Sequence, residues 1–154
     1  MSDRQNADKA TIAFRRLLKD ARTGDQARVD ALVVLAQRTV FAVNWPGSDT
    51  EIRTLTNSTG ETALPLFTSR ETMEEAARRY GWDSPDGSLS SAEMGSRQAL
   101  RQAVARNVHF VVVDIGTDYA GEFKLEEIEP LLSAQSERDA AGPFAGAGKV
   151  STTL

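Results

Sequence analysis

The run Ala63-Leu64-Pro65-Leu66-Phe67-Thr68-Ser69-Arg70-Glu71 decides how this chain folds, because it predicts the end of a strand and the start of a helix within nine residues. Its apolar half is typical of a buried strand, which we expect to span 62–67. Pro65 has no backbone N–H to donate, so this strand is expected at a sheet edge or a bulge. Thr68 and Glu71 have the spacing of a capping box, which predicts that a helix begins there.

Two helices and two strands are expected before this run. Apolar residues recur at helical spacing over residues 8–22, and Asp25 is a favoured N-cap for a second helix that would form a hairpin with the first. Segments 40–43 and 51–56 have the composition or alternation of strands, so with 62–67 they predict an antiparallel meander. On the buried face of the second helix we expect Val29, Leu32, Val33 and Ala36.

From the end of the run onward the sequence predicts three helices and two strands. The helix that follows 62–67 carries an apolar stripe of Met73, Ala76, Ala77 and Tyr80, and we expect it to end at Gly81. Residues 90–93 have capping-box spacing and predict a helix to residue 106. The continuous apolar run 109–115 is typical of a central strand covered on both faces. A short strand at 122–125 and an acidic helix at 126–133 complete the set.

These elements predict an α+β fold in which a single central, largely antiparallel (mixed) β-sheet is flanked by helices. Residues 1–24 should form an N-terminal helix that packs on the domain, and residues 25–133 the α+β domain itself. Residues 134–154 are rich in Ala, Gly, Ser and Thr, so we expect a flexible tail.

The composition of the chain excludes several classes of protein. Of its 154 residues, 40% are hydrophobic and 26% charged, as in an ordinary globular domain. The net charge of −4 argues against nucleic-acid binding, which needs a basic surface to meet the phosphates. No apolar run is long enough to span a membrane, and the polar N-terminus does not look like a signal peptide. We therefore expect no membrane insertion and a cytoplasmic location.

No pattern in the sequence predicts a catalytic centre or a cofactor. The chain has no cysteine, and its one histidine, His109, begins the apolar strand, where a structural role is the commoner one. The glycine-rich run 142–151 contains Gly-Lys but fails as a phosphate-binding loop, because Val150 stands where the motif needs Ser or Thr.

Three carboxylates around the turn after the apolar strand are weak candidates for a metal site: Asp114, Asp118 and Glu122. They lack the full ligand set of a calcium loop, and solvated turn carboxylates are the commoner explanation. An alternative function is accordingly a small-molecule- or metal-dependent enzyme that uses carboxylates near Asp114.

Three residues are candidates for contact with another protein of unknown identity: Trp45, Pro65 and Arg70. Trp45 is the one aromatic residue in a predicted turn, and exposed aromatic residues are enriched among binding anchors. A loop packed on the core is the commoner explanation for such a residue. Pro65 and Arg70 belong to the run quoted above. Its expected edge strand could also pair with a second copy of the chain, giving a homodimer.

Four segments together resemble a known family: 31–36 (Ala-Leu-Val-Val-Leu-Ala), 40–43 (Val-Phe-Ala-Val), 64–71 (Leu-Pro-Leu-Phe-Thr-Ser-Arg-Glu) and the strand 109–115. Their order over residues 12–133 is similar to that of the SseB protein N-terminal domain family, with the Pro-x-Phe-Thr-Ser run as its sharp motif. The resemblance implies a compact α+β domain of a bacterial protein, with one sheet flanked by helices and no established catalytic residues. Together with the missing catalytic pattern, it implies a non-enzymatic protein-interaction or scaffold domain.

Overall fold

A computed structural model describes the backbone of residues 2–140 and the side chains of residues 9–133. Within these residues five helices and two sheets form an α+β fold, which confirms the predicted class. The helices are α1 (Ser2–Asp20), α2 (Asp25–Leu35), α3 (Arg70–Tyr80), α4 (Ser96–Ala105) and α5 (Leu125–Ala140). The strands are β1 (Thr39–Val43), β2 (Leu55–Thr56), β3 (Thr62–Leu66), β4 (Ser91–Gly95), β5 (Phe110–Val113) and β6 (Gly121–Lys124).

The strands divide into two sheets instead of the single sheet that the sequence predicted. The larger sheet has the order β2-β3-β5-β6, with β3 and β5 parallel and the outer pairs antiparallel. β1 pairs with β4 in a separate two-stranded ribbon. Two isolated bridges connect this part of the chain to the other predicted strands. Phe41 of β1 bridges to Phe67, and Asn44, the residue after β1, bridges to Ile52. The meander prediction is therefore confirmed for β2 and β3, which pair antiparallel, and wrong for β1, because β4 offers β1 a longer partner than the two-residue β2 does.

β4 replaces the start of a helix that capping-box spacing had predicted at 90–93. All five of its residues, Ser91–Gly95, pair with β1, so the backbone groups that face β1 are satisfied across strands. The helix begins only at Ser96, after an N-cap residue, Gly95, that makes no side-chain cap bond. A local capping signal stabilises a helix less than pairing along a whole strand stabilises a sheet, so this segment is a strand.

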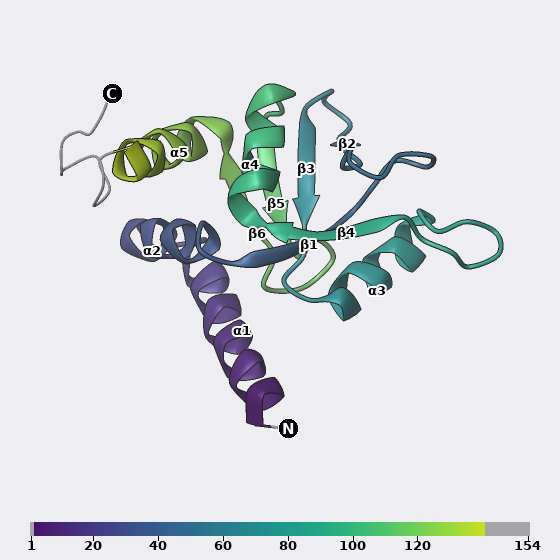
Figure 1. The fold of residues 1–154 in the computed structure, drawn as a ribbon, viewed down its shortest axis with the longest axis horizontal. Coiled ribbons are helices and arrows are strands. Elements are labelled where there is room, and N and C mark those ends of the chain that lie inside the picture. Colours follow the sequence, from purple (N-terminus) through teal and green to yellow (C-terminus); the bar gives the residue numbers. More distant parts are fainter. Residues whose placement is uncertain (1, 141–154) are drawn as a thin grey trace.

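One face of the four-stranded sheet carries the main core. Figure 1 shows the α1–α2 hairpin and α5 to one side of this sheet and α3 to the other. The core side chains from β3, β5 and β6 are Leu64, Leu66, Val111, Val113 and Phe123, each fully buried. They pack in one cluster with buried residues of α1, α2, α4 and α5, which include Phe14, Leu18, Leu35, Leu100 and Ile128.

α2 buries a different face from the one predicted. Leu32 is buried as expected, but Val29 and Val33 are 54% and 43% exposed. The helix turns Ala31, Leu32 and Leu35 to the core, and each residue is about 100° from the next around the helix axis. Its N-cap is Gly24 and not Asp25, which already belongs to the helix.

β3 is not an edge strand. β5 pairs with it along Ala63 to Leu66, and β2 pairs with Thr62 and Ala63 on its other side. Pro65 lies beyond the end of β2, so it has a strand neighbour on one side only, and a residue without N–H is tolerated in such a position. The side chain of Pro65 is buried.

α3 begins one residue later than predicted and is capped by a different pair. Ser69 is the N-cap, and its Oγ accepts from the backbone N–H of Thr72 (3.2 Å), whose own hydroxyl accepts from the N–H of Ser69 (3.3 Å). Thr68 cannot serve as the cap, because its hydroxyl is bound to a buried carboxylate described below. At the other end Gly81 has a left-handed backbone, with φ of 72°, and ends the helix as predicted.

α5 continues to Ala140, past residue 133 where the domain was expected to end, and Pro130 stands within it. The rest of the predicted tail, with the glycine-rich run 142–151, lies outside the described residues. Among the helices that the structure describes, none has both the length and the apolar character to cross a membrane.

The cap of α3 gives a direct test of this arrangement. Ser69→Ala should lower the free energy of unfolding by about 1 kcal/mol, because it removes the acceptor for the N–H of Thr72. Glu71→Ala, at the position of the predicted but unused capping box, is the matched control and should change it by less than about 0.5 kcal/mol. Urea unfolding measures both. The reverse order of the two effects would mean that Thr68 and Glu71 form the cap after all.

Candidate functional site

The second face of the four-stranded sheet carries a groove with a volume of about 420 Å³. Residues that pair across neighbouring strands point to the same face, and so do alternate residues along one strand. The pairing of Leu55 with Ala63 and of Ala63 with Phe110 therefore places these three side chains together, and Val112 follows Phe110 on the same face. They form an apolar floor to the groove.

The aromatic residues at the end of α3 line the groove beside this floor. Because Gly81 reverses the chain, Trp82 returns against the helix, and its N–H donates to the carbonyl of Ala77 (2.8 Å). The rings of Tyr80 and Trp82 stack with their centroids 5.3 Å apart. Trp82 is 9% exposed and Tyr80 is 44% exposed, although the sequence had placed Tyr80 on the buried stripe of α3.

Trp45 joins this aromatic group through an arginine. The guanidinium of Arg53 lies 4.7 Å from the ring centroid of Trp45 and 5.5 Å from that of Trp82. Trp45, Arg53, Trp82 and Tyr80 thus form a continuous stack, which we call the aromatic stack. Partly buried cation–π contacts of this kind are stabilising by about 1 kcal/mol each. Sequence reasoning singled out Trp45 but missed Arg53, because no residue pattern indicates that the arginine lies between Trp45 and the distant Trp82.

Two acidic residues line the groove beside the polar Thr56 and Asn57. Glu122 is exposed on β6, where it pairs with Val112 of the floor. Glu61, before β3, is held by the side chains of Asn57 (3.1 Å) and Thr59 (3.2 Å). An apolar floor with aromatic residues and two carboxylates suits an apolar group that carries a positive charge beside it.

Asp114, the main metal-site candidate, is fully buried and bound within the protein. Its carboxylate accepts from the backbone N–H of Thr68 (2.8 Å) and from the Thr68 hydroxyl (2.6 Å), and Arg15 Nε lies 3.7 Å away. Burial raises the pKa of the Asp114 carboxyl, and the bonds from Thr68 and the charge of Arg15 oppose that rise in part. Asp114 therefore connects α1, the start of α3 and the end of β5.

The other metal candidates do not join Asp114. Asp118 is exposed in the turn before β6, and Glu122 lines the groove. Over the part of the chain that the structure describes, no three acidic or histidine side chains are grouped as metal ligands would be. His109 has a structural contact, because its Nδ1 accepts from the N–H of Thr62 (3.0 Å).

Of the remaining candidates for partner contact, Arg70 is at the surface and Pro65 is not. Arg70 is exposed at the first residue of α3, with its guanidinium 5.3 Å from the ring centroid of Phe41. Pro65 is buried in β3, on the same face as the groove floor but without contributing to its lining.

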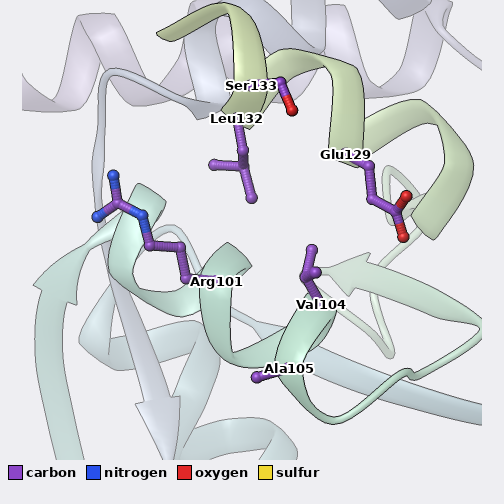
Figure 2. A pocket seen from close by; sticks show the side chains of 6 residues that line it. All are labelled: Arg101, Val104, Ala105, Glu129, Leu132 and Ser133. Carbon is purple, nitrogen blue, oxygen red and sulfur yellow. The ribbon is translucent and has the colours of Figure 1, made fainter. Parts of the chain in front are cut away.

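A second cavity, of about 620 Å³, lies between α4 and α5. Figure 2 shows Val104 and Leu132 facing each other across it, with the charged groups of Arg101 and Glu129 on opposite sides. This cavity has no aromatic residue among its described lining, whereas the groove on the sheet has three. Aromatic side chains are enriched among binding anchors, so the groove is the stronger candidate.

Comparison with known proteins places the chain in a family. The model of the SseB protein N-terminal domain matches residues 14–130, most of the 154-residue chain, which confirms the resemblance found in the sequence. No curated protein matches the sequence.

The environment of Asp114 predicts a particular pH dependence. In the folded protein the carboxyl ionises above its ordinary pKa of 3.8, so ionisation disfavours the folded state. The stability of the wild type should therefore fall relative to that of Asp114→Asn as the pH rises from below 3.8 through the raised pKa. Urea unfolding over a pH series measures this difference.

Asp118→Asn, which removes one exposed negative charge from the same turn, is the control for the loss of charge alone. A difference between wild type and Asp114→Asn that stays constant with pH, or that grows in favour of the wild type as pH rises, would contradict the assigned environment.

Proposed function

The chain belongs to the SseB protein N-terminal domain family, and we propose that it is a non-enzymatic protein-interaction domain that binds its partner in the groove on the four-stranded sheet. The observation that carries this proposal is the composition of the groove, which combines an apolar floor on β2, β3 and β5 with the stacked rings of Tyr80 and Trp82. Large aromatic side chains in partly formed pockets dominate the affinity of many protein interfaces.

A protein segment suits the groove better than a metabolite does. Sites for small molecules bring several polar groups together on the ligand to fix its orientation. Among the described residues that line this groove, the carboxylates are those of Glu61 and Glu122, and they lie beside a floor of strand residues. The enzyme alternative that used Asp114 with Asp118 and Glu122 is not proposed, because these three carboxylates do not form a group.

The charges at the groove define the chemistry of the partner. Glu61 and Glu122 would attract Lys or Arg, and the whole chain carries a net charge of −4. We therefore propose a partner segment in which apolar side chains enter the groove and a basic residue lies beside them. Such a segment leaves no carboxylate of the groove facing an apolar group.

Trp45 and Arg70 have separate parts in this proposal. Trp45 acts indirectly, because it holds Arg53 against Trp82 and so supports the position of Tyr80. Arg70, exposed at the start of α3, is a proposed additional contact. Pro65 is left out because its side chain is buried.

Selection from a displayed library of random short peptides tests the proposal. Purified protein should enrich peptides that combine apolar residues with Lys or Arg. A synthetic peptide from that set should bind Tyr80→Ala with an affinity about tenfold or more below that of the wild type, because the exposed ring of the stack is removed. Glu122→Lys should shift the selection away from basic peptides.

Val29→Ala is the control, since Val29 is exposed on α2 and contributes nothing to the groove. Failure to enrich any peptide class, or equal affinity of the peptide for wild type and Tyr80→Ala, would contradict the proposal. Sedimentation equilibrium separates a third outcome: self-association that Tyr80→Ala abolishes would make the occupant a second copy of the chain instead.

A further inference from the structure

The start of α4 lines a further cavity, which has a volume of about 490 Å³ and shares no residue with the groove. Arg38, Arg97 and Arg101 line it, and no acidic residue is among its described lining. We propose that this cavity binds a phosphate group, either as free inorganic phosphate or as the phosphoryl group of a small phosphomonoester.

The start of α4 supplies the first part of such a site. The helix has ten residues, its N-cap Gly95 makes no side-chain cap bond, and its first turn contains no acidic residue. The N–H groups in the first turn of a helix have no partner within the helix, and the helix dipole favours an anion at that end. Arg38 is adjacent, because its carbonyl accepts from the N–H of Ser96 (2.8 Å).

Ser96 provides an independent indication of a ligand. Its side chain is 1% exposed and lines the cavity, yet its hydroxyl has no hydrogen-bond partner within the protein. A buried hydroxyl without a hydrogen-bond partner destabilises the folded protein. A hydroxyl can donate to a phosphate oxygen, so a bound phosphate would satisfy this group at the entrance to the helix.

Arg38 is held in place and still has a donor to spare. Its Nη2 donates to the hydroxyl of Thr11 (3.0 Å), and its guanidinium lies 5.0 Å from the ring centroid of Phe14. Its buried Nε has no hydrogen-bond partner. Burial lowers the pKa of Arg38, and the negative charge of Asp114 opposes that fall.

Arg101 adds a second charge from the next turn of α4. It is exposed and forms no ion pair within the described part of the chain. In Figure 2 its guanidinium points away from the carboxylate of Glu129. Arg38 and Arg101 together match the charge of a phosphate group, about −1.5 to −2 at neutral pH, better than that of a single carboxylate.

Isothermal titration of the full chain with inorganic phosphate and, separately, with O-phosphoserine tests the inference at constant ionic strength. At least one of the two should bind saturably. Ser96→Ala and Arg101→Gln should each weaken that binding by about tenfold, the usual effect of losing one hydrogen bond or ion pair to a charged ligand. Arg16→Gln, which removes an exposed arginine of α1, is the matched control and should leave the affinity within about twofold.

The two ligands distinguish the source of the phosphate. Tighter binding of O-phosphoserine indicates a phosphomonoester, and tighter binding of inorganic phosphate indicates the free ion. Absence of saturable binding by both overturns the inference. Binding that Arg101→Gln weakens but Ser96→Ala leaves unchanged also overturns it, because the anion would then be held by surface charge alone. Ser96→Ala removes an unpaired hydroxyl and should not lower the thermal stability of the ligand-free protein.

Discussion

The buried contact between the carboxylate of Asp114 and the amide and hydroxyl of Thr68 is the interaction on which the rest of the structure depends. It arises from the parallel pairing of β3 and β5, whose register sets Leu66 opposite Val113. The ends of the two strands therefore lie together, and the N–H of Asp114 also donates to the carbonyl of Leu66 (2.8 Å). Because α3 starts two residues after Thr68, this contact fixes where the helix begins.

The position of α3 in turn creates the groove. The helix ends at Gly81, and the reversal there brings Tyr80 and Trp82 to the open face of the sheet. Arg53 and Trp45 then complete the aromatic stack from a different part of the chain. The proposed phosphate site depends on a separate junction, where β4 passes into α4 beside Arg38. The two proposed sites therefore share no lining residue.

Features that depend on neighbouring residues were predictable from the sequence, and features that depend on distant partners were not. The strand around Pro65, the apolar strand that became β5 and the helix end at Gly81 follow from local composition and backbone preferences. Residues 90–93 have capping-box spacing, yet the pairing of Ser91–Gly95 with β1 makes this segment a strand. Thr68 was predicted as an N-cap, but its hydroxyl donates to Asp114, which is far away in the sequence. For the same reason the contact of Arg53 with Trp82 could not be predicted, although Trp45 could be singled out.

The central claim is that Asp114 and Thr68 stabilise the fold jointly, and a double-mutant cycle measures this directly. Thr68→Val, Asp114→Ala and the double variant would be compared with the wild type by urea unfolding. Asp114 has a φ of 56°, and the strain that alanine meets there is present in both variants that carry it, so it cancels in the cycle. A buried, charge-assisted contact predicts a coupling free energy of about 1–3 kcal/mol. Effects that add to within about 0.5 kcal/mol would contradict the account.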